Sequence, residues 1–281
     1  MNTSKPTDAA DADESRFQFG KNWHAFLGSL DEDRVEQAIR SLRELLGDSL
    51  EDKRFLDLGS GSGLFSLAAH RLGADVVSVD YDDDSVDCTN HLRRTFANDS
   101  DRWVVKQGSA LDEDQMASFG EFDVVYSWGV LHHTGDLWRA IEVAARCVRT
   151  DGRFVLSIYN DQGSASRRWL RIKQIYNASP RPLRPAWAAA VASVYEAKFA
   201  LARLRHGRNP LPFADWKAKR LDRGMSAWHD WVDWVGGLPF EVAGPDAIVE
   251  YLTRRGFETQ QIKRIGKGWG CNEFVFRRLR L

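Results

Sequence analysis

The chain has 281 residues, of which 43% are hydrophobic and 28% charged, the composition of an ordinary globular protein. It contains no run of eighteen apolar residues, so we expect no membrane-spanning helix. The formal net charge is −1, but residues 161–223 carry 14 Lys and Arg against 4 Asp and Glu, so this internal segment differs in kind from its surroundings.

The first 16 residues are polar and acidic, which predicts a disordered tail rather than a secretion signal. Apolar residues at helical spacing predict a helix over 34–46, within an N-terminal helical arm of residues 17–52. From 53 to 160, short apolar segments alternate with helical ones, which is typical of βαβ units in a parallel sheet. The expected strands are 54–58, 75–79, 103–106, 122–127 and 153–159, and the helices between them 63–72, 84–96 and 137–148.

The alternation stops after residue 160. Residues 161–244 include two helical stretches, 166–176 and 186–204, and an unstructured loop of this length is implausible in a compact domain. We therefore expect a helical cap inserted after the fifth strand.

The sheet pattern resumes over 245–281, with a helix at 245–255 and strands at 257–264 and 272–278 joined by a glycine-rich link, which predicts an antiparallel pair. The predicted fold is α/β: a Rossmann-like, doubly wound, seven-stranded sheet whose last strand is antiparallel, with a mostly helical insertion after the fifth strand. The three cysteines, Cys88, Cys147 and Cys271, have neither disulfide-framework nor metal-ligand spacing, so a cytoplasmic location is expected.

The most informative motif lies where the first strand turns into a helix and reads FLDLGSGSG, residues 55–63. Glycines there let the backbone approach a ligand closely, and the spacing is G-x-G-x-G rather than the dinucleotide pattern G-x-G-x-x-G. Asp57 precedes the glycines, and a carboxylate there suits a cationic group and would repel a pyrophosphate. The second strand ends in Asp80, the position at which an acid accepts hydrogen bonds from ribose hydroxyls.

Four segments in this order, FLDLGSGSG, VVSVD, FDVVYSWGVLHH and DGRFVLSIYN, resemble the motifs of class I S-adenosylmethionine (SAM)-dependent methyltransferases. The resemblance covers about residues 54–160, and the final helix and two strands fit that family's reversed sheet edge. The core is also similar to methyltransferases of ubiquinone and menaquinone biosynthesis, but their pattern does not extend through the insertion, so a quinone substrate is not implied. The resemblance implies that SAM is the cofactor and S-adenosylhomocysteine (SAH) the product.

By this resemblance, SAM binds along the carboxyl edge of the sheet. Asp80 would hold the ribose, and Tyr81 would pack on the adenine. Ser109 stands where many relatives have an acid that binds the adenine amine. Asn22 and Trp23 either close over SAM as a lid or pack within the N-terminal arm. The other implied contacts are Asp57, Gly59, Ser60, Gly61 and Gly63 along the methionine part, Ala110 beside the adenine, and Ser127 and Trp128 near the reactive end.

Methyl transfer from a sulfonium requires proximity and orientation, and a hydroxyl acceptor also benefits from a general base. His132 and His133 follow the fourth strand, where small-molecule O-methyltransferases of this superfamily often carry a histidine, and we predict His133 as the base. The alternative is that one histidine caps the turn while the other packs. His229 and Asp233 are four residues apart on an expected helix, and either form a catalytic pair or a surface pair. The spacing of these residues is not diagnostic of a metal site, and none is expected.

The basic, aromatic insertion leaves three interpretations open. In the first, the insertion is a lid whose polar face is simply exposed to solvent. In the second, it contacts an anionic membrane and admits a lipid-tailed acceptor. In the third, it binds an anionic acceptor. We predict a SAM-dependent methyltransferase that acts on a small molecule by O-methylation. The alternatives are an RNA or protein methyltransferase that uses the insertion, and a non-catalytic SAM-binding protein. Nucleic acid ranks lower because the overall charge is near neutral and no RNA-binding module is visible.

Overall fold

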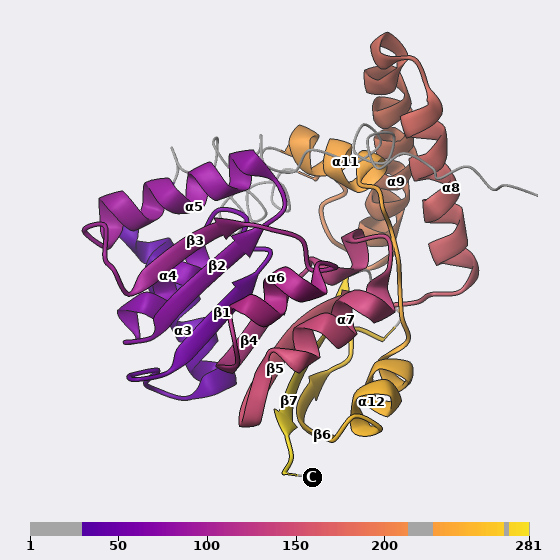
Figure 1. Cartoon of the computed structure of the whole chain (residues 1–281). Helices are drawn as coiled ribbons and strands as arrows, with labels where there is room; N and C mark the ends of the chain where they lie inside the picture. The colour runs from indigo at the N-terminus through magenta and orange to yellow at the C-terminus, as the bar shows by residue number, and fades with distance from the viewer. Residues whose placement is uncertain (1–29, 213–226, 267–269, 281) are drawn as a thin grey trace, which may run out of the picture. The chain divides into compact units, whose positions relative to one another are not determined.

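The computed structural model describes residues 30–212, 227–266 and 270–280 (Figure 1). The described residues form two compact units. The larger unit comprises 30–166 and 241–280, and the smaller unit lies within 167–240. None of the described helices is long and apolar enough to cross a membrane.

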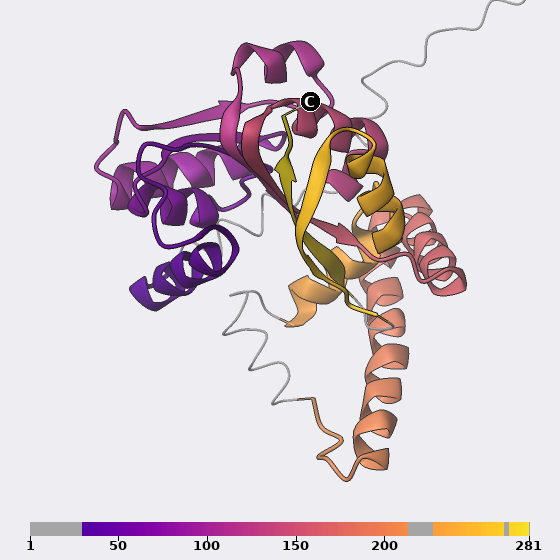
Figure 2. The ribbon, with the colours of Figure 1, turned by 90° about the horizontal axis from the view of Figure 1, so that it is seen from below.

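The larger unit is built on a seven-stranded sheet with the strand order β3-β2-β1-β4-β5-β7-β6 (Figure 1). The first five strands along the chain are parallel, whereas β7 runs antiparallel to both β5 and β6 (Figure 2). This arrangement confirms the predicted doubly wound sheet with an antiparallel last strand. The strands are β1 (Arg54–Leu58), β2 (Asp75–Asp80), β3 (Trp103–Gln107), β4 (Phe122–Trp128), β5 (Val148–Tyr159), β6 (Phe257–Lys263) and β7 (Cys271–Arg278).

Helices cover both faces of this sheet, and each face has its own core (Figure 1). Successive strand residues point to opposite faces, so Phe55 joins the core beneath α3, α4 and α5, and Leu56 joins the core beneath α6, α7 and α12. The helices are α3 (Glu32–Leu46), α4 (Leu64–Arg71), α5 (Asp83–Phe96), α6 (Glu113–Ser118), α7 (Leu137–Arg146) and α12 (Pro245–Thr253), with a short 3₁₀ turn η1 (Leu131–His133) before α7.

Aspartate side chains begin four of these helices. Asp31, Asp82, Asp112 and Asp136 each accept a hydrogen bond from a first-turn amide of α3, α5, α6 and α7 respectively, which satisfies a donor that the helix leaves unpaired. Helix α6 was not expected, because its six residues are too few to show a helical period.

The expected boundary between α7 and β5 was also wrong. The helix ends at Arg146, and β5 begins at Val148, because Val148 pairs with Phe122 before an irregularity in the register, after which Arg153 pairs with Val124.

The smaller unit is helical, as predicted for the segment after the fifth strand. Its core joins Trp169, Tyr195 and Trp231, with the rings of Trp169 and Tyr195 stacked at 4.9 Å. Two hydrogen bonds connect the helices. Trp231 Nε1 of α11 donates to Glu196 Oε1 of α9 at 3.2 Å, and Lys173 Nζ of α8 donates to the Trp234 carbonyl of α11 at 2.6 Å. The helices are α8 (Ser164–Ala178), η2 (Arg181–Leu183), α9 (Arg184–Arg205) and α11 (Ala227–Gly236).

Candidate cofactor site and histidine turn

The glycine turn, residues 59–63, connects β1 to α4. Gly59, Gly61 and Gly63 have φ angles of 87°, 54° and 82°, a region that side chains other than glycine rarely adopt. The Gly59 amide donates to the Val79 carbonyl at 2.7 Å, so the turn lies against the end of β2. Gly63 is the N-cap residue of α4, and the first amides of that helix make this end favourable for a polar or anionic group.

Helix α5 fixes the shape of this turn. A Cβ atom on Gly63 would lie 2.9 Å from the Cα atom of Thr89, so the close approach of the two backbones requires glycine. The Thr89 hydroxyl lies 3.0 Å from Ser60 Oγ and donates to the Gly61 carbonyl at 3.3 Å. The turn is therefore held from β2 on one side and from α5 on the other.

Asp80 ends β2 beside the glycine turn. Its carboxylate accepts hydrogen bonds from the amides of Gly61 at 2.8 Å and Asp82 at 3.0 Å. Burial raises the pKa of Asp80, while these two amides lower it. The Gly108 amide donates to the Asp80 carbonyl at 2.8 Å, which brings the end of β3 to the same part of the sheet edge.

The predicted adenine contacts lie around Asp80. Tyr81 is 45% exposed at the end of β2. Ser109 is half-buried after β3, and its hydroxyl accepts a hydrogen bond from the Leu111 amide at 3.2 Å, while Ala110 is buried. The structure thus gathers an exposed aromatic ring, a carboxylate and a short polar turn at the ends of two neighbouring strands.

Asp57 lies within the core between the sheet and α4. Its carboxylate accepts a hydrogen bond of 2.5 Å from Ser66, whose hydroxyl is 2.6 Å from that of Ser78, and Trp103 Nε1 donates to Ser78 at 2.8 Å. Burial raises the pKa of Asp57 to about 7; the Ser66 hydroxyl opposes this rise, and the nearby charge of Asp80 adds to it. This buried network was not predicted, since isolated serines carry no sequence signal for it.

The end of β4 meets the glycine turn. The buried Ser127 hydroxyl donates to the Leu58 carbonyl at 2.8 Å, and Trp128 stacks on Tyr126 with 5.7 Å between ring centroids. Val130 follows, and a Cβ atom on Gly59 would lie 2.8 Å from its Cβ atom. The segment that leads to the two histidines is therefore packed on the glycine turn.

The two adjacent histidines differ in environment. His132 is fully buried, and its Nδ1 atom accepts a 3.4 Å hydrogen bond from the Tyr159 amide. The Tyr159 ring lies 4.0 Å from the His132 ring and 5.5 Å, edge-on, from the His133 ring. His133 is half-buried. Of the pair, His133 is the more accessible to a reacting group, and His132 forms part of the packing beneath it.

Glu241 holds the histidine turn, which we define as residues 130–137. Its amide donates to the His132 carbonyl at 3.0 Å, and its carboxylate accepts from the amides of Gly135 and Leu137, each at 3.1 Å. Burial raises the pKa of Glu241, and these two amides lower it. Sequence reasoning missed this residue, because more than 100 residues separate it from its partners.

Four predicted residues stand apart from this edge. Asn22 and Trp23 lie outside the described residues. His229 and Asp233 belong to α11 in the smaller unit, and their side chains are likewise outside what is described. The helix itself is as expected, and its Trp231 packs in the core of that unit. Within the described ranges, no group of three His, Cys, Asp or Glu side chains could hold a metal ion.

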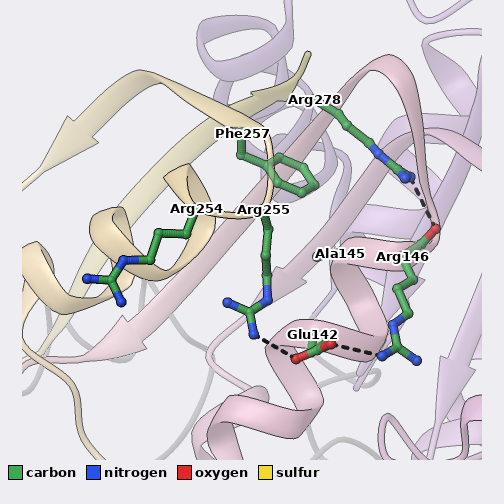
Figure 3. Close-up of a pocket in the computed structure, with 7 residues that line it drawn as sticks. All are labelled: Glu142, Ala145, Arg146, Arg254, Arg255, Phe257 and Arg278. Carbon is green, nitrogen blue, oxygen red and sulfur yellow. Dashed lines mark hydrogen bonds and ion pairs between the residues drawn. The ribbon is translucent and has the colours of Figure 1, made fainter. Parts of the chain in front are cut away.

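A surface hollow lies at the opposite end of the strands, where Arg278 donates to the Arg146 carbonyl at 3.5 Å (Figure 3). Arg278 also donates to the Val148 carbonyl at the start of β5. Glu142 of α7 is central to it, and accepts hydrogen bonds from Arg146 at 2.8 Å and Arg255 at 3.0 Å. The Tyr251 hydroxyl also donates to Glu142, at 2.8 Å. The Arg146 pair lies within α7, whereas Tyr251 of α12 and Arg255, which follows that helix, tie this end of α12 to α7. We therefore assign the hollow a structural role.

Comparison with known proteins agrees with this architecture. The chain matches the methyltransferase domain family over residues 30–261. The ubiquinone biosynthesis O-methyltransferase of Azorhizobium caulinodans is 33% identical over 123 residues, which are 43% of this chain and 44% of that protein. The mitochondrial ubiquinone biosynthesis O-methyltransferase of Bos taurus is 27% identical over 114 residues, 41% of this chain and 30% of that protein. The matched region thus spans less than half of either relative.

Solved structures share the fold at low identity. Magnesium protoporphyrin IX methyltransferase of Synechocystis PCC 6803, crystallised with SAH, gives a TM-score of 0.51 at 13% identity and covers 98% of this chain and 90% of that one. The [4+2]-cyclase SpnF gives a TM-score of 0.53 at 11% identity, and the match covers 87% of this chain and 80% of that one. Together with the family match, the seven-stranded sheet and the glycine turn, these findings show that the chain belongs to the class I SAM-dependent methyltransferases.

Proposed function

We propose that this protein transfers the methyl group of SAM to a hydroxyl group of a small molecule, with His133 as the general base. The observation that carries the proposal is the packing of Val130 on Gly59, because it joins the glycine turn directly to the histidine turn at the carboxyl edge of the sheet. Ligands of doubly wound sheets bind at this edge. The O-methyltransferase relatives support oxygen as the acceptor atom.

The residues at this edge suit SAM. Asp80 offers carboxylate oxygens for ribose hydroxyls, and the exposed ring of Tyr81 offers a face for adenine. Gly61 and the amides that open α4 suit the methionine carboxylate, and the buried carboxylate of Asp57 would suit the ammonium group. Ser60, Gly63, Ser109, Ala110, Ser127 and Trp128 complete the proposed contacts. When bound, SAM supplies an electrophilic methyl group.

His133 would accept the proton that the acceptor hydroxyl loses as its oxygen attacks the methyl carbon. Its half-buried ring stays within reach of an acceptor, and histidine is the side chain that most often serves as a general base. His132 would support the ring from below through its contact with Tyr159. We propose further that Asn22 and Trp23 close over SAM, and that His229 and Asp233 form a catalytic pair.

Calorimetric titration with SAM and SAH tests the cofactor assignment. We expect Asp80→Ala to lose binding, since the ribose contact and the Gly61 hydrogen bond both disappear. Asp75→Ala is the matched control, because Asp75 lies at the other end of the same strand and pairs with Arg102 at the surface. If the folded wild-type protein binds neither ligand, the proposal fails and a non-catalytic role replaces it.

The smaller unit supports a lipid-tailed acceptor taken from an anionic membrane surface. Residues 167–208 contain ten Lys and Arg against one acid, Glu196. On α9 an outer stripe of Ala190, Val194, Ala197, Leu201 and Leu204 repeats every three or four residues on one face, and its three larger side chains are at least 50% exposed. An apolar stripe among basic residues is typical of helices that lie on anionic lipid.

Vesicle sedimentation tests this surface. We expect the protein to bind phosphatidylglycerol-containing vesicles more strongly than phosphatidylcholine vesicles, with binding weakened by salt. The double variant Leu201→Glu/Leu204→Glu should reduce it, whereas Leu279→Glu, an exposed apolar position in the larger unit, should not. Equal binding by the double variant would reject the membrane contact. Preferential binding to RNA over vesicles would favour the RNA methyltransferase alternative, with Arg167, Arg168 and Arg171 as its contacts.

A cytoplasmic location is part of the proposal. Its support is that Cys88 and Cys147 are buried thiols that form no disulfide, as is usual for proteins of a reducing compartment.

A further inference from the structure

Glu241 makes three hydrogen bonds to one short turn. Its amide reaches the His132 carbonyl, and its two carboxylate oxygens reach the amides of Gly135 and Leu137 separately. Leu137 begins α7, and Asp136 already caps another amide of that first turn, the one at Arg139. Glu241 therefore satisfies a helix-end donor that Asp136 leaves, and it fixes the backbone on both sides of His133.

The segment after Glu241 is anchored at the same place. The Ala243 amide donates to the Tyr159 carbonyl at 3.0 Å, and the Asp161 amide donates to the Ala243 carbonyl at 3.3 Å. Tyr159 in turn contacts both histidine rings. Asp161 precedes the inserted helices and Glu241 follows them, so the two points where the chain leaves and re-enters the larger unit meet beside the histidine turn.

We propose that Glu241 is a positioning residue that holds His133 in its working orientation. The inference rests on the proposed role of His133. The hydrogen bonds of Glu241 to this turn all reach backbone groups, so it acts through the backbone of the turn.

Histidine ring signals in the NMR spectrum of the cofactor-free protein test this link. The protein has seven histidines, and the variants His132→Gln and His133→Gln assign the two relevant signals. We expect Glu241→Ala to shift and broaden the signals of both His132 and His133. Glu241→Gln should give an intermediate shift, because its amide group keeps one acceptor oxygen but places a donor opposite the second amide.

Glu250→Ala is the matched control, since Glu250 is an exposed glutamate of α12 in the same unit and pairs only with Arg254 among the described ion pairs. Unchanged histidine signals in Glu241→Ala, or equal shifts in Glu250→Ala, would overturn the proposal. If Glu241→Ala does not fold, Glu241→Gln decides the matter: unchanged signals again reject the role.

Two further measurements distinguish a positioning role of Glu241 from a general effect on stability, and keep this test separate from that of the proposed function. SAH affinity should be the same in Glu241→Gln and wild type, and with an active acceptor Glu241→Gln should lower kcat while KM for SAM stays unchanged. Equal losses in kcat and in SAH affinity would indicate a merely structural residue. The histidine signals are read without cofactor, so a failure of SAM binding would sink the proposed function and leave this result standing.

Discussion

Gly59 and Val130 lie so close that glycine is required at position 59. A Cβ atom on Gly59 would approach the Val130 Cβ atom to 2.8 Å, and the φ angle of Gly59 is 87°. The contact joins two segments that are 71 positions apart in the sequence. It makes the shape of the cofactor turn and the position of the histidine turn depend on each other.

Substitution of Gly59 by alanine should therefore weaken SAH binding by at least about tenfold. Two costs combine: strain at a positive φ angle and the overlap with Val130. The double variant Gly59→Ala/Val130→Ala should recover part of the loss, because it removes the overlap but not the strain. Gly47→Ala is the control, since its φ is 95° but no atom lies near its Cβ position. Calorimetric titration with SAH measures these affinities. An unchanged SAH affinity in Gly59→Ala would contradict the assignment of the glycine turn to the cofactor site.

Asp57 should make stability fall as the pH rises. Burial raises its pKa from 3.8 to about 7, so between these values the folded protein holds a proton that the unfolded chain has released. The free energy of unfolding should decrease across this window, and Asp57→Asn should flatten that dependence. Urea unfolding at a series of pH values measures it. If the free energy of unfolding falls with pH equally in the wild type and in Asp57→Asn, another group is responsible.

The same group should couple SAM binding to proton release. A bound ammonium group favours the ionised carboxylate, so SAM should bind more tightly as the pH rises through about 7. Calorimetry in two buffers of different ionisation enthalpy counts the protons released. We expect release near neutral pH in the wild type and none in Asp57→Asn; equal release would place the ammonium group elsewhere.

The two histidines should respond differently to substitution by glutamine. His133→Gln should lower the methyl-transfer rate by about 10²–10⁴, the usual contribution of a general base, with SAH affinity unchanged. His132→Gln should instead lower the melting temperature, because its ring is fully buried against Tyr159. SAH formation from SAM with a panel of phenols measures the first effect, and thermal unfolding the second. Full activity in His133→Gln would exclude it as the base.

Glu142 should stabilise the larger unit above pH 4.5. The hydroxyl of Tyr251 and the guanidinium groups of Arg146 and Arg255 lower its pKa from 4.5 to about 2, so this stabilisation is lost as the pH falls between these values. Glu142→Gln should melt a few degrees below wild type at neutral pH, and the difference should shrink in acid and in high salt. Glu250→Gln serves as control; a difference independent of pH would contradict the ion-pair explanation.

The sequence allowed prediction of whatever depends on local pattern. Strand β1 and the turn at Gly59–Gly63 follow from a short apolar segment and the glycine spacing, and the helical nature of α8 and α9 follows from their period. The antiparallel last strand also follows, because the family resemblance supplies the reversed sheet edge. Helix α6 and the start of β5 escaped detection because the first is too short for a period and the second depends on pairing with Phe122.

Much of the candidate site depends on contacts between distant segments instead. Glu241 and Ser66 are unremarkable in sequence, and only the fold brings them to the histidine turn and to Asp57. Likewise, the difference between His132 and His133 arises from packing against Tyr159, which adjacent identical residues cannot reveal.

The position of β7 has a consequence for the order in which the sheet is completed. Strand β6 is made before β7, yet among the described residues it pairs with β7 alone, and β7 also supplies the outer partner of β5. During synthesis β5 therefore keeps an open edge while the inserted helices and β6 are made. Phe274 and Phe276 close the core beneath α12 only when β7 arrives. Strand β7, which lies between β5 and β6, is thus synthesised after both of them. Until β7 pairs, the edges of β5 and β6 can pair with other strands instead.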